Sequence, residues 1–192
     1  AFATASILVA LGVAKRSGQG QFVDISIFDC AISMNATFLS QYFFGMEPGR
    51  IGNRHVSMSP WNAYHASDGW VLLCTGSNEQ WKRVCNVIGR PELATDPAFD
   101  VPKKRVANYV AVDGFVQAWT SQRSTNECLE KFNELQLPCG PVYGLAEMFN
   151  DPSLLAREMV HQVVDTETGK SLKVAGSVFR GTQCKGRARR AI

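Results

Sequence analysis

The sequence predicts an α/β protein whose pattern changes part-way along the chain. Residues 1–15 are rich in Ala and Leu, with apolar residues on nearly all faces at helical spacing, which indicates a buried helix. Residues 21–27 alternate and are rich in β-branched side chains, as strands are, and residues 29–44 indicate a second helix. Helix, short strand and helix suit an α/β layer, whereas the Asp68-Gly69 pair downstream predicts a hairpin and therefore antiparallel pairing.

Turn and capping signals divide the rest of the chain into short elements. Ser77 with Gln80, and Ser124 with Glu127, each form a capping box, in which the two side chains satisfy backbone N–H groups at a helix start. The predicted elements are strands at 63–66 and 70–75, helices at 78–89, 108–120, 125–135 and 153–159, a turn and short strand at 137–142, and a second hairpin of 160–165 with 171–174.

The formal net charge of +3 is unevenly distributed. Residues 184–192 carry four basic side chains and no acid, so the remainder is close to neutral, which argues against a nucleic-acid-binding surface. The longest apolar run, residues 1–14, is interrupted by polar residues and is shorter than the ~20 residues of a membrane span. It also lacks the basic region of a signal peptide. We expect no nucleic acid and no membrane as partners, and a chain that begins inside a helix.

Six cysteines occur at irregular spacings without a Cys-x-x-Cys pair. This pattern fits neither a zinc framework nor a compact disulfide scaffold, and no other metal-ligand spacing is present. Most of the cysteines lie beside apolar residues, as buried reduced cysteines do in cytosolic proteins. We therefore expect a cytoplasmic protein without a metal site.

The loop around His55 is the first candidate for chemistry. It is polar and expected to be exposed, and it contains Ser57 and Ser59. A Ser–His pair could act as nucleophile and base, but the sequence has no Gly-x-Ser-x-Gly elbow and no acid placed to orient the ring. A loop histidine that bonds the backbone is therefore the favoured interpretation, and His65 and His161 are predicted to be structural.

Other polar clusters have simpler interpretations. Asp24 and Asp29 flank a strand–helix junction, where their spacing does not show that the carboxylates converge, and Asp29 is interpreted as a helix cap. Residues 17–20 are glycine-rich but follow a helix, whereas a phosphate-binding turn precedes one. The four tryptophans are widely spread, which favours core anchors over a platform for stacking bases.

Four segments together resemble the family III CoA-transferases, the group that includes formyl-CoA and carnitine CoA-transferases. Residues 8–35, LVALGVAKRSGQGQFVDISIFDCAISMN, are similar to the family pattern AL…R…TG.GQ.VDVSLLDAA. Residues 49–74 are similar to R.GN.H…PY..F…DG, residues 88–99 to LG.PEL..DPRF, and residues 137–160 to P.GPV…E…DP…AR.MV. Each match is weak by itself, and their common order over most of residues 8–160 makes the resemblance fairly specific.

The resemblance implies an interlocked homodimer whose subunits each contain a large Rossmann-like domain and a small α+β domain. Residues 1–46 would belong to the large domain, residues 47–60 would form a linker, and residues 61–145 would form the small domain. Residues 146–192 would return toward the large domain and finish in the divergent basic tail. The expected fold class is therefore α/β, the end of a Rossmann-like domain joined to a small α+β domain.

The resemblance also implies a reaction and a site. CoA moves from an acyl-CoA to an acceptor carboxylic acid through an aspartyl intermediate, with the CoA thioester as substrate and no cofactor. The nucleophilic aspartate precedes the helix in which the chain starts, so we expect no catalytic residue in these 192 residues and no activity of the chain alone. Ile27 is the implied CoA contact, and the implied active-site loop over the carboxylate comprises Asn53, His55, Val56, Ser57, Met58 and Ser59.

Two alternatives remain open at this point. An α-methylacyl-CoA racemase resembles the same family but works by proton transfer at the α-carbon, and its acid–base residues would also lie largely upstream. A non-catalytic CoA-binding or dimerisation module is favoured, for the chain by itself, by the missing aspartate. Because residues 55–60 contain no glycine, we also expect the loop to be less mobile than the glycine-rich loops of this family.

Overall fold

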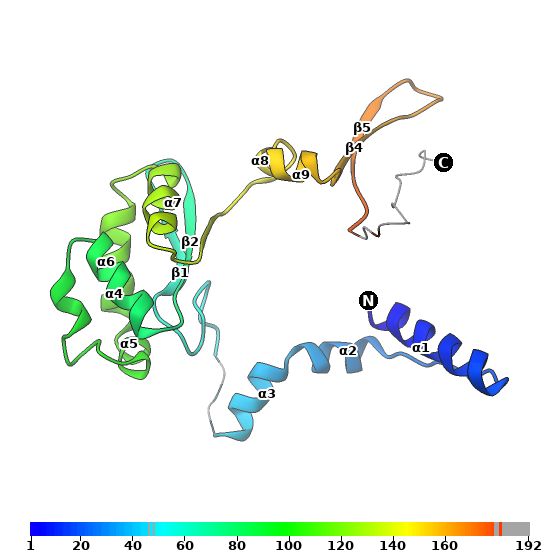
Figure 1. The fold of residues 1–192 in the computed structure, drawn as a ribbon, viewed down its shortest axis with the longest axis horizontal. Helices are drawn as coiled ribbons and strands as arrows, with labels where there is room; N and C mark the ends of the chain where they lie inside the picture. Colours follow the sequence, from blue (N-terminus) through cyan, green and yellow to red (C-terminus); the bar gives the residue numbers. More distant parts are fainter. Residues whose placement is uncertain (46, 48, 179–180, 182–192) are drawn as a thin grey trace. The chain divides into compact units, whose positions relative to one another are not determined.

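The computed structural model describes residues 1–45, 47, 49–178 and 181 of the 192-residue chain. The chain divides into two units, Ala1–Gly52 and Asn53–Ile192, which are described separately (Figure 1). The division lies within the predicted linker, and the predicted domain boundaries remain predictions. The basic tail at residues 184–192 lies outside the described residues.

The first unit consists of the helices α1 (Phe2–Ser17), α2 (Ile27–Met34) and α3 (Ala36–Phe43). α1 confirms the first predicted helix and ends at Gly18, whose φ of 72° lies in the left-handed region that glycine adopts at helix C-termini. The backbone N–H of Gly18 bonds to the carbonyl of Ala14 and so satisfies one of the last carbonyls of the helix.

The predicted strand at residues 21–27 is wrong. Residues 19–26 take no regular structure, and Ile27 opens α2 instead. The hydroxyl oxygen of Ser26 caps that helix by accepting the backbone N–H of Asp29 at 3.3 Å, so Asp29 lies in the first turn and is not the predicted cap. A β-branched segment becomes a strand only if a neighbour satisfies its backbone groups, and the described part of this unit contains no strand to pair with it.

The predicted single helix at residues 29–44 is divided at Asn35. The side-chain amide of Asn35 donates to the carbonyl of Ala31 at 2.7 Å and competes with the backbone bond of the next turn. Two helices of eight residues each, α2 and α3, therefore replace one longer helix.

The first unit has almost no interior of its own. Among its described residues Gln41 is buried, whereas α1, which was predicted to be buried, contains no buried residue. Leu8 and Val9 on α1 are 64% and 67% exposed, and Phe28 on α2 is 72% exposed. The prediction of a buried first helix is therefore wrong for this chain alone.

The second unit contains an antiparallel sheet in the order β1 (Trp61–His65), β2 (Trp70–Cys74) and β3 (Cys139–Pro141). The predicted hairpin is confirmed, and all five residues of β1 pair with β2. Tyr64 and Val71 lie opposite each other and are buried, while the neighbouring pair is partly exposed. This alternation gives the sheet one face that packs on the core.

Helices between β2 and β3 cover that face. They are α4 (Asn78–Val87), the 3-10 helix η1 (Pro91–Ala94), α5 (Pro102–Ala107), α6 (Tyr109–Thr120) and α7 (Thr125–Glu134). α6 packs against β1, α7 against β2 and β3, and α4 against α7 (Figure 1). Both predicted capping boxes are confirmed, at Ser77 and at Ser124. η1 and α5 were not predicted, although each starts with the proline that favours a first helical turn.

The core of the second unit lies between the sheet and these helices. Its most buried side chains are Tyr64, Val71 and Leu73 of the sheet, Trp81, Val84 and Cys85 of α4, Val112 and Val116 of α6, and Cys128 and Phe132 of α7. Of the tryptophans predicted to be core anchors, Trp81 and Trp119 are buried, whereas Trp70 is 39% exposed. The indole N–H of Trp81 donates to the carbonyl of Leu93 at 3.3 Å, so the buried ring keeps its hydrogen bond.

Beyond β3 the chain forms two short helices and a hairpin. They are α8 (Leu145–Met148), α9 (Pro152–Ala156), β4 (Val160–Val164) and β5 (Ser171–Ala175). The second predicted hairpin is confirmed, and Asp151 caps α9 as predicted. α9 ends earlier than predicted, before Glu158, whose φ is 53°. In the described part of the chain, no helix is long and apolar enough to cross a membrane.

Candidate functional site

The predicted active-site loop leads directly into β1. Its residues differ in exposure: Asn53 and Ser57 are exposed, whereas His55, Val56 and Met58 are partly buried. Ser59 is only 6% exposed, so the expectation of an exposed loop is wrong at this end. The loop therefore has a surface part and a buried part.

Hydrogen bonds close the loop at its base. The backbone N–H of His55 donates to the carbonyl of Trp61 at 3.0 Å, and the centroids of the two rings lie 4.6 Å apart. The carbonyl of Pro60 accepts the backbone N–H of Thr75 at 3.0 Å and the Thr75 hydroxyl at 2.6 Å. The end of the loop is thereby tied to the end of β2.

The imidazole of His55 is turned toward its own loop. Nδ1 accepts the backbone N–H of Ser57 at 3.2 Å, and the Ser57 hydroxyl lies 3.3 Å from the same nitrogen. In a neutral imidazole, the nitrogen that accepts an N–H uses its lone pair and carries no proton. The ring proton of this tautomer is therefore on Nε2. Among the described residues, no carboxylate contacts the ring. The geometry agrees with a loop histidine bonded to the backbone rather than a base for Ser57.

Arg54 fixes the start of the loop to α6. The central carbon of its guanidinium lies 3.4 Å from the ring centroid of Tyr109, within the range of a cation–π interaction. Sequence reasoning missed this contact, because a single arginine in a loop carries no signal for a distant aromatic partner.

Arg105, on α5, is a second residue that sequence reasoning missed. Its Nε donates to the carbonyl of Ser59 at 3.0 Å, and the residue is only 2% exposed. In the sequence it follows Lys103 and Lys104, a run typical of a solvated basic surface. Burial lowers the pKa of Arg105 from its usual value, because the charged form loses water. The buried guanidinium joins the loop to the helical part of the unit.

Polar side chains also hold β1 to α6. Gln117 bonds both backbone groups of His65, accepting the N–H and donating to the carbonyl at 3.0 Å each. The His65 ring lies against Trp70, with the ring centroids 3.4 Å apart, and its structural role stays a prediction. Asp113 accepts the hydroxyl of Tyr64 at 2.7 Å and the side-chain amide of Asn62 at 3.0 Å. Burial, followed by the charge of Asp113, raises the pKa of Tyr64 well above its usual value. The strand that follows the loop is therefore fixed at several points.

The predicted CoA contact lies in the first unit, where Ile27 opens α2 and is 88% exposed. Residues on both sides of Ile27 line a hollow of ≈ 180 Å³, together with α1; the lining residues are Phe2, Ser6, Asp24, Ile25, Ser26, Asp29, Cys30 and Ser33. The structure thus brings Asp24 and Asp29 to one hollow, which their spacing in the sequence did not show. Ile27 itself is not among the lining residues.

The buried thiols of the second unit do not provide a nucleophile. Burial raises the pKa of Cys85 to about 12 and that of Cys128 to about 11, so both are protonated near neutral pH. Across the described residues, no group of three His, Cys, Asp or Glu side chains is arranged to hold a metal ion.

Comparison with known proteins shows which family contains this chain. The model of CoA-transferase family III matches residues 1–192. The chain belongs to CoA-transferase family III. Among family relatives, the succinyl-CoA–D-citramalate CoA-transferase of Chloroflexus aurantiacus is 32% identical over 171 residues, or 88% of this chain. The acetyl-CoA:oxalate CoA-transferase of Acetobacter aceti is 34% identical over 160 residues, or 83% of this chain.

Structural comparison agrees with this family assignment. The crystal structure of a CaiB/BaiF family protein from Brucella suis matches 97% of this chain with a TM-score of 0.74 and 27% identity. This chain spans 48% of that protein, and 42% and 41% of the two CoA-transferases. The family resemblance and the α/β fold class inferred from the sequence are thereby confirmed.

Proposed function

We propose that the protein is a CoA-transferase that moves CoA from an acyl-CoA thioester to an acceptor carboxylic acid. The observation that carries this proposal is the match of the family III model to residues 1–192. The names of the two relatives each pair a CoA thioester with a carboxylic acid, which supports substrates of the same two classes here. Because this chain spans less than half of those relatives, the activity is assigned to the whole protein.

The proposed reaction is nucleophilic catalysis by an aspartate outside these 192 residues. Its carboxylate attacks the thioester carbonyl, which releases the CoA thiolate and forms a mixed anhydride. The thiolate then attacks the aspartyl carbonyl, which releases the first carboxylate and leaves an aspartyl-CoA thioester. The acceptor carboxylate attacks that thioester, which releases the CoA thiolate and forms a second mixed anhydride. The thiolate then attacks the acceptor carbonyl of this anhydride, which gives the new acyl-CoA and regenerates the aspartate. Each step is an acyl transfer without a change of oxidation state, so the proposed reaction needs no metal or redox cofactor.

We assign the loop at residues 53–59 to this site, as a cover over the aspartyl intermediates. The proposed contacts are Asn53, His55, Val56, Ser57, Met58 and Ser59, with Ile27 against the CoA. Backbone N–H groups and polar side chains of such a loop would exclude water and stabilise the oxyanions that form in each transfer step. The fixed base of the loop supports this role, because a cover that stabilises charge must be held in place before the reaction.

We also propose that the protein is a cytoplasmic homodimer. The exposed apolar side chains of the first unit, with Leu8, Val9 and Phe28 each more than 60% exposed, support association with a second copy. The unpaired thiols of the described cysteines support a reducing compartment. Sedimentation velocity of the whole protein at micromolar concentration tests the first statement, and a stable monomer would contradict it.

The transferase assay compares the whole protein with the 192-residue chain. Each is mixed with an acyl-CoA and a panel of carboxylic acids, and new acyl-CoA species are followed by mass spectrometry. We expect transfer by the whole protein and none by the chain alone. Transfer by the chain alone that survives His55→Ala would overturn the assignment of the nucleophile to an aspartate elsewhere.

The same preparations separate the two alternative functions. A racemase would incorporate solvent deuterium at the α-carbon of a 2-methylacyl-CoA without any acceptor acid. A non-catalytic module would bind CoA in calorimetry and turn over neither substrate. Either result in place of CoA transfer would replace the function proposed here.

A further inference from the structure

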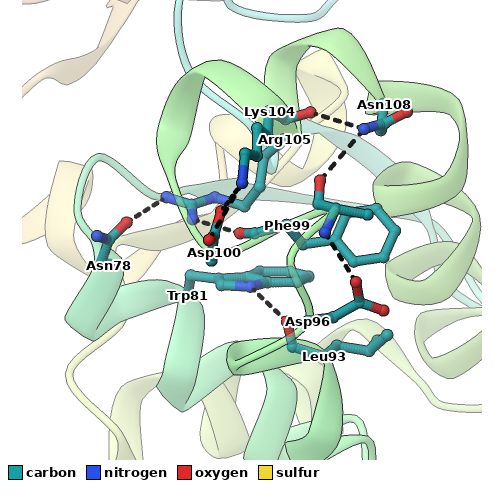
Figure 2. Close-up of polar contacts among 10 residues, drawn as sticks. Asn78, Trp81, Leu93, Asp96, Phe99, Asp100, Lys104, Arg105 and Asn108 are labelled. Atoms are coloured by element: carbon teal, nitrogen blue, oxygen red, sulfur yellow. Dashed lines mark hydrogen bonds and ion pairs between the residues drawn. The ribbon is translucent and has the colours of Figure 1, made fainter.

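Arg105 is a buried cation that bonds three separate segments of the second unit. Its Nε donates to the carbonyl of Ser59 at 3.0 Å, its Nη1 to the carbonyl of Phe99 at 2.8 Å and its Nη2 to Oδ1 of Asn78 at 3.0 Å. Figure 2 shows the last two bonds and the indole of Trp81 beside the guanidinium, whose central carbon lies 5.6 Å from that ring. The side chain therefore links the active-site loop, the chain after η1 and the first turn of α4.

The three acceptors of Arg105 are neutral, which is unusual for a guanidinium that is 2% exposed. The neighbouring carboxylate, Asp100, pairs with Lys104, whose Nζ lies 2.9 Å from Oδ1 (Figure 2), and acts on Arg105 through its charge. Burying a cation without a hydrogen-bonded carboxylate is costly. The guanidinium nevertheless satisfies three acceptors that an apolar side chain would leave without this donor. Through these three bonds, the planar guanidinium fixes the positions of its three acceptors relative to one another.

The bond to Ser59 acts at a particular point of the loop. Ser59 and Pro60 present consecutive carbonyls, one held by Arg105 and the other by Thr75 at the end of β2. His55, at the other end, is bonded to Trp61. The tip between these points, residues 56–58, therefore takes its position from anchors that belong to α5 and the sheet.

We propose that Arg105 is a positioning residue for this loop: it sets where the tip lies over the reacting groups, without contacting them. The inference rests on the proposed function for its effect on rate, but its structural half can be tested by itself. A displacement of a positioning group by about 1 Å can cost ~10²-fold in rate. Loss of one anchor of the loop should accordingly lower turnover much more than it weakens substrate binding.

Three variants test the proposal in the whole protein. Arg105→Lys keeps the charge and loses the planar fork, and Asn78→Ala removes one acceptor of Arg105 at an exposed residue of α4. Asn86→Ala is the matched control, because it makes the same change at an exposed position of the same helix. Asn78→Ala keeps the test decisive if Arg105→Lys fails to fold.

The first readout is hydrogen exchange at the backbone amides of His55 and Thr75. The His55 amide donates to the carbonyl of Trp61, and the Thr75 amide donates to the carbonyl of Pro60. We expect Arg105→Lys and Asn78→Ala to speed exchange there about tenfold, the size of one lost hydrogen bond, while the amides of the β1–β2 pairing and all amides of Asn86→Ala stay unchanged. Unchanged exchange at His55 and Thr75 in both folded variants would overturn the proposal.

The second readout is the division of the kinetic effect between kcat and KM. We expect kcat to fall about tenfold in Asn78→Ala and up to ~10²-fold in Arg105→Lys, with KM for the acyl-CoA within about threefold of wild type. Wild-type kcat in both folded variants, or a fall that only follows lost thermal stability, would overturn the proposal. If the wild-type protein transfers no CoA, the proposed function fails, and the exchange measurement alone decides whether Arg105 positions the loop.

Discussion

The phenol of Tyr64, on β1, donates a hydrogen bond to Asp113, on α6, at 2.7 Å. Tyr64 is 1% exposed, so this bond replaces the water that its hydroxyl loses on folding. The second carboxylate oxygen of Asp113 accepts the amide of Asn62, two residues earlier on the same strand. One carboxylate thus fixes the strand that follows the proposed active-site loop against a helix of the core.

Asp113→Ala should therefore destabilise the second unit by about 1–3 kcal/mol, because it leaves the Tyr64 hydroxyl buried without a partner. The double variant Tyr64→Phe/Asp113→Ala should be less destabilised than the two single changes added together. Urea unfolding followed by tryptophan fluorescence measures this, since all four tryptophans lie in the second unit. Simple additivity of the single changes would show that the pair is not coupled.

Asp68 should make stability depend on pH in the acid range. Its Oδ1 accepts the backbone N–H of Thr125 at 2.7 Å and the Thr125 hydroxyl at 2.8 Å, and these bonds lower the pKa of Asp68. Because the folded pKa lies below the unfolded one, the contribution is complete above the unfolded pKa and is lost as the pH falls through the folded pKa. Asp68→Asn should lower the melting temperature at pH 7, and the difference from wild type should shrink below about pH 4.

Glu130→Gln provides the control for that series, because Glu130 is exposed on α7 and the substitution changes the net charge equally. Its melting temperature should follow the wild-type protein at every pH. A wild-type-minus-Asp68→Asn difference that stays constant down to pH 2 would show that the Asp68 carboxylate contributes no titratable stability.

The hydroxyl of Ser59 should add nothing to stability. It is buried and has no hydrogen-bond partner among the described residues, so Ser59→Ala should change the free energy of unfolding by less than about 0.5 kcal/mol or raise it. Thr75→Val, which removes the hydroxyl bonded to the Pro60 carbonyl, should cost about 1 kcal/mol, and Thr75→Ser should cost less. Equal losses for Ser59→Ala and Thr75→Val in chemical denaturation would contradict this ranking.

Ser57→Ala should lower the turnover of the whole protein. Ser57 is exposed at the tip of the loop, where a hydroxyl can reach a developing oxyanion, and the loss of one such donor can cost ~10²-fold in rate. Ser57→Ala should lower kcat with little change in melting temperature, and Ser67→Ala, at an exposed serine outside the loop, is the matched control. Equal rates for Ser57→Ala and wild type would remove Ser57 from the proposed site.

Cys85 and Cys128 should resist thiol reagents in the folded chain. Both are buried and their pKa values are raised to about 12 and about 11, so neither access nor thiolate is available near pH 7. Maleimide labelling followed by peptide mapping should modify the partly exposed Cys30 and Cys139 first. Labelling of Cys85 at the rate of Cys30 would indicate that the core opens readily.

Local chemistry was readable from the sequence where a few neighbouring residues decide the outcome. The capping box at Ser77 and the turn at Asp68 depend on side chains within four positions, and the structure contains both. The prediction of a strand at residues 21–27 was wrong for the opposite reason. Its composition favours a strand, but a strand is decided by a partner, and Ser26 instead caps a helix.

The supports of the candidate site were hidden from the sequence because they are contacts between distant segments. Lys103, Lys104 and Arg105 form one basic run, yet the turn of α5 leaves the two lysines exposed and buries the arginine. Ser59 likewise lies in a polar stretch, and its burial follows from how the chain enters β1. The family resemblance pointed to the loop, and the geometry identifies what holds it.

Because the base of the loop is held by other residues, the sequence at the tip should have little effect on the stability of the fold. Arg54 and Arg105 hold it near its two ends, and Thr75 holds the carbonyl of the residue just before β1. Residues 56–58 can therefore be exchanged as a cassette. A library randomised at these three positions should yield mostly folded proteins, so that a screen would report the effect of the loop on turnover rather than on the capacity to fold.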